Sequence, residues 1–265
     1  MPDTALNAAA SGLYAQQVNI KTIANNIANI NTTSFKKNRA EFKDLMYQDI
    51  STNPENSDIP GFVEDSDSTI QVGTGVKPTS TQKIFTQGNL QQTGQKLDMA
   101  IHGDGFFQLR NADGNYVYSR DGSFKLSADG SVVSSGGHLL EPGFTVNADV
   151  LSIEMTTDGT VSAIGTDGQK VDIGNIELVK FVNPGGLKAL GNNLYSETEQ
   201  SGIPLIGTPG SEGFGEVHQG YLESSNVDIV EEMMNMITAQ RAYEINSKTV
   251  KTVDDMMTMA NNLKQ

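Results

Sequence analysis

The chain has 265 residues, of which 37% are apolar, enough to build a buried core and about two domains. Acidic residues number 32 and basic residues 18, and a net charge of -14 repels nucleic-acid phosphates and anionic lipid surfaces. There is no cysteine, which excludes disulfides, thiolate metal ligands and cysteine nucleophiles. We therefore expect a folded protein that does not bind nucleic acid.

The N-terminus reads Met1-Pro2-Asp3-Thr4 and lacks the basic start and apolar core of a secretory signal peptide. No stretch of the chain approaches the roughly 20 consecutive apolar residues that a membrane-spanning helix needs. We expect neither a cleaved signal peptide nor insertion into a membrane.

The two ends of the chain differ in composition from its middle. Long stretches without glycine or proline occupy the ends, while Asp-Gly dipeptides and β-branched residues are frequent in the centre. This pattern predicts an α+β fold, in which N- and C-terminal α-helices form a coiled-coil layer and a central domain is antiparallel and β-rich. The expected divisions are an N-terminal helix in 1–40, an extended connector or long hairpin in 41–84, the β domain in 85–221 and a C-terminal helix in 222–265.

A heptad pattern of apolar residues marks the N-terminal helix. One series recurs every seven residues and a second follows it by three, which is the pattern of the a and d positions of a coiled coil. The predicted assembly seam comprises Leu6, Leu13, Ile20, Ile23, Ile27 and Ile30. Asparagines with low helix propensity cluster near its end, at Asn25, Asn26, Asn29 and Asn31. We expect the helix to end near Asn31.

The C-terminal helix has a clear start signal. Asp228 followed three residues later by Glu231 is typical of an N-cap, and an apolar periodicity begins directly afterwards. The pattern lasts for about 35 residues, or about 50 Å of helix. Its predicted assembly seam comprises Ile229, Met233, Met236, Tyr243, Val250, Val253 and Met257, flanked by Ala239 and Ala260.

The two seams could belong to ordinary core helices or to helices that pair on assembly. Their positions at opposite ends of the chain, and the narrowness of each stripe, favour helix-on-helix packing. Burial of the six large aliphatic residues of the N-terminal seam is worth on the order of 10 kcal/mol. We therefore predict that the terminal helices order and pack when copies of the chain assemble.

Asp-Gly dipeptides punctuate the middle of the chain at 113–114, 121–122 and 129–130, with strand-forming residues between them. Asp-Gly supplies the positive φ of tight hairpin turns, so this spacing predicts an antiparallel meander that continues through 158–159 and 167–168. Residues 48–68 are polar, contain Pro54 and Pro60, and carry an acidic cluster. We interpret them as a connector.

Enzymatic and metal-binding motifs are absent from the sequence. His102, His138 and His218 have no second ligand at metal-binding spacing, and the glycine pairs 73/75 and 103/105 lack the third glycine of a dinucleotide-binding loop. We expect no catalytic site, no cofactor and no metal. A carboxylate hydrolase acting on cell-wall glycan, and a β-rich binding module on a coiled-coil stalk, remain alternatives to a structural subunit.

Motifs near both ends resemble a known family. The run Ala24-Asn-Asn-Ile-Ala-Asn-Ile-Asn-Thr-Thr-Ser-Phe-Lys36 resembles the N-terminal signature of the bacterial flagellar rod and hook proteins. Gly220-Tyr-Leu-Glu-Ser-Ser-Asn-Val-Asp228 and Met236-Ile-Thr-Ala-Gln-Arg-Ala-Tyr-Glu-Ile-Asn-Ser-Lys248 resemble its C-terminal signature. The polar signature residues are Asn25, Asn26, Asn29, Asn31, Gln240, Arg241, Glu244 and Asn246.

Central motifs extend the resemblance over most of the chain. Ile101-His-Gly-Asp-Gly-Phe-Phe107 and Tyr118-Ser-Arg-Asp-Gly-Ser-Phe124 resemble β-domain landmarks of the family. The similarity is greatest to members that build the distal part of the rod, through Ile70-Gln-Val-Gly-Thr-Gly-Val76 and Gln87-Gly-Asn-Leu90. Ser34 departs from the pattern, because relatives commonly carry glycine there; if the position needs a positive φ, serine is strained.

The resemblance implies a structural role rather than an enzymatic one. It implies a homopolymer in the form of a helical tube that transmits torque, with proximal rod proteins, the hook protein and the P and L ring proteins as partners. It also implies export by the flagellar type III apparatus and a place in the rod, spanning the periplasm toward the outer membrane. A proximal rod or hook protein of the same family is the alternative. Polar signature residues could fix the register of the helices, and Arg241 with Glu244 could form an ion pair.

Overall fold

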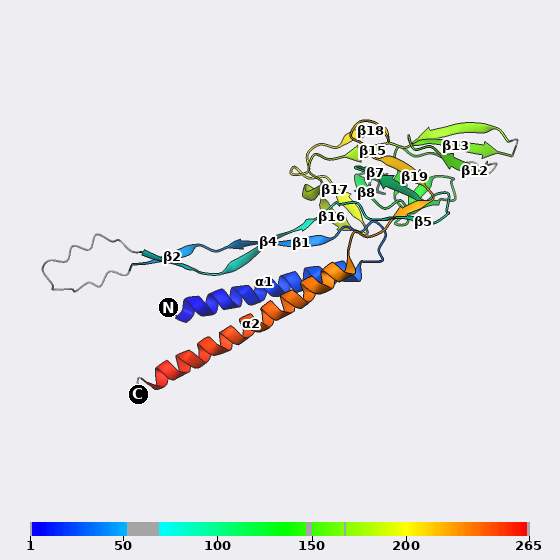
Figure 1. Ribbon diagram of the computed structural model, residues 1–265. Coiled ribbons are helices and arrows are strands. Elements are labelled where there is room, and N and C mark those ends of the chain that lie inside the picture. Colours follow the sequence, from blue (N-terminus) through cyan, green and yellow to red (C-terminus); the bar gives the residue numbers. More distant parts are fainter. Residues whose placement is uncertain (1, 52–68, 147–149, 167, 264–265) are drawn as a thin grey trace. The chain divides into compact units, whose positions relative to one another are not determined.

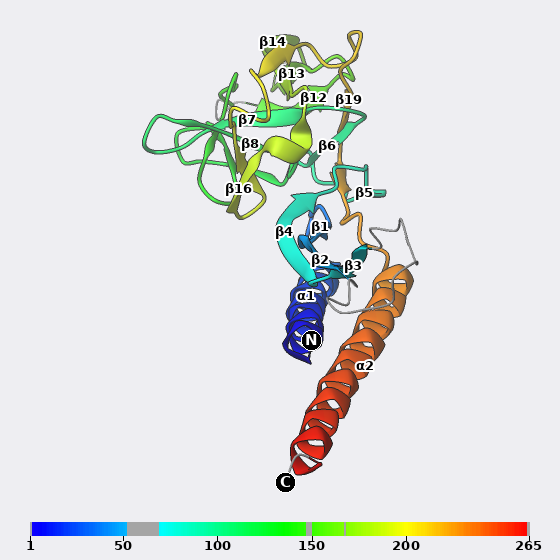
Figure 2. The same ribbon diagram turned by 90° about the vertical axis from the view of Figure 1, so that its left-hand side faces the viewer.

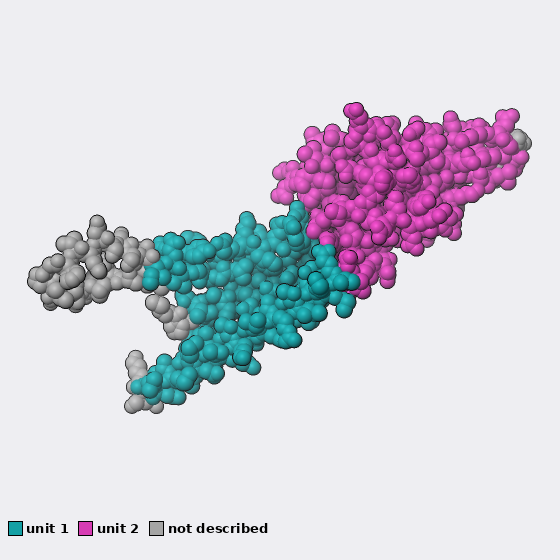
Figure 3. All heavy atoms as spheres, in the orientation of Figure 1, with its two compact units in different colours: residues 1–25, 38–82, 230–265 teal, residues 26–37, 83–229 magenta. Residues whose placement is uncertain are grey.

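A computed structural model describes residues 2–51, 69–146, 150–166 and 168–263. They fall into two compact units (Figure 3): unit 1 contains 1–25, 38–82 and 230–265, and unit 2 contains 26–37 and 83–229. The fold is α+β, with a helix near each end of the chain and antiparallel strands between them, as predicted. Most of the predicted connector at 48–68 lies outside the described residues.

The terminal helices are α1 (Pro2–Ala28) and α2 (Ile229–Asn262). Helix α2 begins directly after Asp228, as its capping signal predicts, and its 34 residues make about 51 Å of helix. Helix α1 ends at Ala28, before the predicted Asn31, because the chain turns there through a bond from the Asn29 amide to the Asn26 carbonyl. Both appear as long single rods, inclined to each other, in Figures 1 and 2. No helix in the described ranges is long and apolar enough to cross a membrane.

Unit 1 also contains a ribbon of two strand pairs. Strand β1 (Asn38–Asp44) pairs with β4 (Val76–Lys83), and β2 (Tyr47–Ser51) pairs antiparallel with β3 (Thr69–Gly73). Apolar side chains of this ribbon are exposed, at Phe42, Leu45, Met46, Tyr47 and Ile70. A two-stranded ribbon with exposed apolar residues is marginally stable on its own, so it favours a further packing partner.

A nine-stranded sheet forms the centre of unit 2. Its path is β16 (Lys188–Gly191), β17 (Leu194–Ser196), β8 (Tyr116–Ser119), β7 (Phe106–Arg110), β11 (Leu139–Leu140), β10 (Val132–Ser134) and β9 (Phe124–Leu126). Strand β15 (Leu178–Lys180) pairs with β7 and with β18 (Leu205–Gly207), and a 3-10 turn follows at Pro184–Gly186. Two smaller pairs are β6 (Met99–His102) with β19 (Glu216–Gln219) and β5 (Leu90–Gln92) with β20 (Tyr221–Glu223). A separate sheet contains β12 (Val150–Met155), β13 (Thr160–Gly165) and β14 (Lys170–Asn175).

The predicted meander is only partly correct. Gly114 and Gly130 have the expected positive φ, and they lie in the β7–β8 and β9–β10 hairpins. Strands β8 and β9 do not pair, because β17 occupies the second edge of β8. Gly122 lies between them for another reason: a Cβ there would be 1.6 Å from the Met99 carbonyl oxygen of β6. The dipeptide at 121–122 therefore marks a close backbone approach rather than a hairpin turn.

The core of unit 2 has two parts. The larger part lies among the main sheet, β6, β13 and β19, and its fully buried members include Met99, Ile101, Phe107, Leu109 and Val161. The smaller part is aromatic, with Phe106, Tyr118, Phe181 and Tyr195 in edge-to-face contacts. Within unit 2, this core fixes the positions of the strands that pack against it.

Candidate assembly surfaces and signature network

Helices α1 and α2 approach closely at a glycine. A Cβ on Gly12 of α1 would be 2.9 Å from the side-chain nitrogen of Asn246 of α2. Small residues on either side of this point, Ala9 and Ala15, are buried. A side of α1 made of small residues thus lets the two helix backbones come together, which a leucine seam alone would not allow.

The same helix also receives the turn between β3 and β4. Gly75 has φ +126, and a Cβ there would be 2.1 Å from Ser11 Oγ. Ser11 Oγ donates to the Ala8 carbonyl over 2.8 Å and accepts from the Val76 amide over 3.1 Å. Ser11 therefore fastens the ribbon of unit 1 to α1.

The predicted seam of α1 is largely covered within this single chain. Ile23 is buried, and the other five members, Leu6, Leu13, Ile20, Ile27 and Ile30, are half-buried. Half-buried aliphatic side chains retain apolar surface that a neighbouring helix could still cover.

The predicted seam of α2 is divided between two sides of the helix. Val253 is buried and Met236, Val250 and Met257 are half-buried, whereas Ile229, Met233 and Tyr243 are exposed. The most buried positions of α2 instead repeat every seven residues through Glu232, Ala239 and Val253, with half-buried Asn246 between the last two. We call this set the inner stripe.

The heptad analysis did not detect a second apolar surface of α2. Besides Met233, seven apolar side chains that are 52% to 88% exposed recur along the helix and just past its end: Val230, Met234, Ile237, Ile245, Met256, Met259 and Leu263. Met234, Ile245 and Met256 are spaced by eleven, a repeat of about 3.67 residues per turn that keeps them on one side of a nearly straight helix. A search for an eleven-residue period would have found this outer stripe.

The polar signature residues have mixed surroundings. Asn26 is buried, Thr32 donates to the Asn29 side chain, and Asn38 donates to the Asn25 side chain. Asn31 and Gln240 are exposed. Arg241 and Glu244 form the expected ion pair over 3.1 Å, with both side chains more than half exposed, so it contributes about 0 to 1 kcal/mol.

A buried ionic network joins the sequence motifs within unit 2. Both oxygens of Glu223 accept charged hydrogen bonds, from Lys36 Nζ over 2.7 Å and from Arg120 Nε over 2.9 Å. The Gly88 amide donates to the same carboxylate over 2.8 Å. The three charged side chains are at most 6% exposed. Ion pairs so deeply buried are strongly destabilised when one partner is removed.

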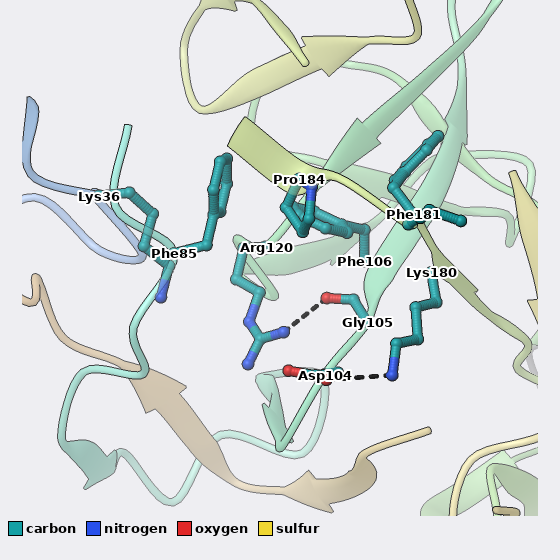
Figure 4. A pocket seen from close by; sticks show the side chains of 10 residues that line it. Lys36, Phe85, Asp104, Gly105, Phe106, Arg120, Lys180, Phe181 and Pro184 are labelled. Carbon is teal, nitrogen blue, oxygen red and sulfur yellow. Dashed lines mark hydrogen bonds and ion pairs between the residues drawn. The ribbon is translucent and has the colours of Figure 1, made fainter. Parts of the chain in front are cut away.

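Arg120 extends this network to the glycine motif at 103–105. Its guanidinium donates to the carbonyls of Gly105 over 2.6 Å, of Ile101 over 3.2 Å and of Gly103. Arg120 lines a cavity of about 140 Å³, together with three phenylalanines and both residues of the Lys180–Asp104 ion pair. Figure 4 shows these side chains and the ion pair. Gly103 and Gly105 have positive φ, so they shape the carbonyl arc that receives the guanidinium.

Ser34 and Asn226 complete the network. Ser34 has φ 55, its amide donates to the Glu223 carbonyl, and its hydroxyl donates to the Arg120 carbonyl over 2.9 Å. Asn226 accepts from the Lys37 amide and donates to the carbonyls of Ile84 and Thr86. Thus the segment that follows α1 and the segment that precedes α2 are joined to each other within unit 2.

Burial and charge act in opposite directions on the pKa of Glu223. Burial raises this pKa, but Arg120 and Lys36 together outweigh burial and hold it below its ordinary value. Burial lowers the pKa of Lys36, and the attraction of Glu223 opposes that change. The carboxylate is therefore ionised in the folded chain at neutral pH.

The structure brings His102 and His218 together, with ring centroids 5.8 Å apart, although they are 116 positions apart in sequence. Over the ranges that the structure describes, no group of three or more metal-ligating side chains forms. Two long helices, one of which exposes an apolar stripe, and a body held by a buried ionic network are typical of a structural subunit that assembles with other chains.

Comparisons with known proteins agree with this class. Residues 6–36 match the family described as flagella basal body rod protein, residues 100–163 the flagellar hook protein FlgE/F/G D1 domain, and residues 218–263 the flagellar basal body rod FlgEFG protein C-terminal family. The chain is 47% identical over 269 residues to the flagellar basal-body rod protein FlgG of Borreliella burgdorferi, covering 98% of each. It is 45% identical to the FlgG of Agrobacterium fabrum, covering 98% of this chain and 99% of that protein. It is 31% identical to the flagellar hook-basal body complex protein FlhP of Bacillus subtilis, covering 97% of each.

The chain belongs to the flagellar basal-body rod and hook protein family. Within it the identities place the chain with the FlgG proteins, as a structural subunit of the distal rod and not an enzyme. The resemblance inferred from the sequence motifs is confirmed.

Proposed function

We propose that copies of this chain polymerise into a helical tube, the distal rod, which acts as a drive shaft between the flagellar motor and the hook. In this proposal α1 and α2 of successive copies form a coiled-coil inner layer through the predicted seams. The β-rich units lie outside that layer and carry contacts between neighbours.

The outer stripe of α2 is the observation that carries this proposal. A helix that already buries one side within its own chain still exposes seven apolar side chains on another side. Their burial between copies would contribute on the order of 10 kcal/mol per subunit. Such a surface favours association, because soluble monomers rarely expose apolar patches of this extent.

Two stripes on one helix also favour an open polymer. The inner stripe faces Gly12 of the same chain through Asn246, which leaves the outer stripe for another copy. In this proposal the outer stripe contacts a surface other than itself on that copy. Contacts between unlike surfaces continue from copy to copy instead of closing on a pair. An open polymer distinguishes a rod subunit from a stalked binding module, which would form small closed oligomers.

The family suggests the remaining partners. We propose that the polymer joins proximal rod proteins at one end and hook protein at the other. It rotates inside the P and L rings, which act as its bushing. In this proposal the chain is exported by the flagellar type III apparatus without a cleaved signal, and the rod spans the periplasm toward the outer membrane. The absence of cysteine is compatible with that oxidising space.

One substitution on the outer stripe tests polymerisation. Ile245→Asp places a charge among apolar side chains and should abolish sedimentable polymer, while Thr258→Asp, at an exposed position off both stripes, should leave it unchanged. Far-ultraviolet circular dichroism of both variants checks that the chain still folds. Normal polymer from the Ile245 variant would overturn the proposal that the outer stripe is an assembly surface.

A further inference from the structure

Two of the three histidines of the chain lie together on one strand pair of unit 2. Strand β6 pairs antiparallel with β19 (Figure 2), and the register places His102 directly opposite Glu216, with His218 two positions further along β19. Paired residues share a face of a sheet, so His102, Glu216 and His218 lie on the same face. Ile101 and Val217, the paired residues between them, lie on the opposite face and are buried in the core.

The spacing of these side chains is close to that of ligands of one metal ion. The ring centroids of His102 and His218 are 5.8 Å apart. Two imidazoles that bind one zinc ion tetrahedrally, each through a nitrogen at about 2.0 to 2.1 Å, hold their centroids about 5 Å apart. His218 Nε2 is 3.7 Å from Glu216 Oε2, and two ligand atoms of such an ion are about 3.3 Å apart. His102 and Glu216 are exposed and His218 is half-buried, so an ion in solution can reach them.

Hydrogen bonds hold the backbone on both sides of His102. Gln87 Nε2 donates to the Ile101 carbonyl over 3.2 Å, and Gln87 Oε1 accepts from the Gly103 amide over 3.0 Å. Arg120 donates to the carbonyls of Ile101 and Gly103. The position of the His102 backbone is therefore fixed within unit 2.

A second glutamine holds the backbone next to His218. Gln219 Nε2 donates to the Lys96 carbonyl over 2.7 Å and to the Ile153 carbonyl over 3.0 Å. Its Oε1 accepts from the Met155 amide over 3.0 Å. Ligands on a fixed backbone lose less conformational freedom when they bind an ion, and this pre-organisation favours affinity.

Contact between rings is the alternative explanation of the histidine pair. His218 also lies edge-to-face with Tyr221, with ring centroids 6.3 Å apart, and such contacts form without a metal. The Glu216 carboxylate beside His218 favours a ligand role, because it adds negative charge and an oxygen donor at the place where the imidazoles meet. The described residues contain no preformed group of three metal ligands, so the ion itself must draw the side chains together.

We propose that His102, His218 and Glu216 bind one divalent transition-metal ion, with the two imidazoles as its principal ligands. Zinc fits this set, because it binds imidazole and carboxylate donors, whereas magnesium and calcium prefer oxygen ligands alone. The bound ion joins β6 to β19 and so braces the strand whose Ile101 carbonyl binds Arg120. This inference concerns a single copy of the chain and does not depend on polymerisation.

Calorimetric titration of the full-length chain with Zn²⁺ tests the site. Excess Mg²⁺ is present to occupy weak carboxylate sites, and we expect one equivalent of zinc to bind. Loss of an outer hydrogen-bond partner of a metal ligand costs about 10- to 100-fold in affinity. Loss of a ligand itself, in His102→Gln or His218→Gln, should therefore weaken binding at least about tenfold. His138→Gln removes the remaining histidine, which lies next to β11, and should leave the affinity unchanged.

A matched pair of acidic substitutions tests the carboxylate ligand. Glu216→Gln keeps an oxygen donor but removes its charge, and should weaken zinc binding. Glu212→Gln, at an exposed position outside the strand pair, should not change it. Equal zinc affinities of these two variants would overturn the assignment of Glu216 as a ligand.

Thermal unfolding is the second measurement. A ligand that binds only the folded chain stabilises it, so saturating Zn²⁺ should raise the melting temperature of the unchanged chain and of His138→Gln. The melting temperatures of His102→Gln and His218→Gln should not rise, and circular dichroism checks that both variants fold. Zinc binding that excess Mg²⁺ abolishes, or that all three histidine variants retain equally, would identify scattered carboxylates as the ligands and overturn the inference.

Discussion

Lys36 and Glu223 lie 187 residues apart in the chain, yet Lys36 Nζ donates to Glu223 Oε1 over 2.7 Å and both side chains are 1% exposed. Arg120 binds the other carboxylate oxygen. One carboxylate thus joins the N-terminal, central and C-terminal motifs of the family within unit 2. Three residues that lie within the family motifs therefore hold together the segments next to α1 and α2.

Loss of the central carboxylate should be costly. Glu223→Gln leaves Lys36 and Arg120 buried without a countercharge, and we expect the free energy of unfolding of unit 2 to fall by about 3 to 5 kcal/mol. Urea denaturation followed by tyrosine fluorescence measures this. Glu244→Gln removes the exposed partner of Arg241 and should cost less than about 1 kcal/mol. Equal effects of the two changes would contradict the network.

Acid should weaken unit 2 through the same group. Because the folded-state pKa of Glu223 lies below its ordinary value of 4.5, its ionised form contributes stability above that pH. That contribution is lost as the pH falls through the lowered value. We expect the melting temperature to drop as the pH falls below about 4.5, the ordinary pKa of the group, and to drop less in Glu223→Gln. An identical acid dependence of the variant would show that other carboxylates are responsible.

Substitution of Ser34 compares the cost of its positive φ with the gain from its side-chain hydrogen bond. Its left-handed backbone costs about 1 kcal/mol relative to glycine, and its hydroxyl bond to the Arg120 carbonyl returns a similar amount. We expect Ser34→Gly to change the free energy of unfolding by less than about 1 kcal/mol and Ser34→Ala to lower it by about 1 to 2 kcal/mol. Chemical denaturation distinguishes the two, and a stable alanine variant would refute this balance.

Gly75 should be intolerant of any side chain. Its φ of +126 is unfavourable for other residues, and a Cβ would overlap Ser11 Oγ, which binds the Val76 amide. Gly75→Ala should detach the turn of the ribbon from α1, seen as faster amide exchange at Val76. Gly94→Ala is the control for positive φ alone, because no heavy atom lies within 4 Å of its added Cβ. Faster exchange at Val76 in both variants would contradict the role of this contact.

The seam of α1 gives a prediction about assembly. Leu13→Asp places a charge on its half-buried surface, which costs several kcal/mol when a neighbour covers it. We expect no polymer and an unchanged thermal transition of unit 2. Asn7→Asp, which adds the same charge at an exposed position of α1, should polymerise normally. Polymer from the Leu13 variant would remove this residue from the seam.

The sequence predicts local features better than distant contacts. Asp228 and Glu231 correctly place the start of α2, because capping depends on neighbours in the chain. The heptad analysis missed the outer stripe, since its spacing of eleven does not fit a template of seven. No local pattern links Arg120 with Glu223, 103 residues away, although both lie in family motifs.

Electron microscopy together with far-ultraviolet circular dichroism, on the purified chain across a range of concentrations, tests the central claim most directly. If α1 and α2 are assembly helices, tubes should appear above a threshold concentration together with a rise in helix signal, and Ile245→Asp should abolish both. A compact monomer at every concentration, with constant helix content, would show that the two helices are ordinary core elements and would contradict the account.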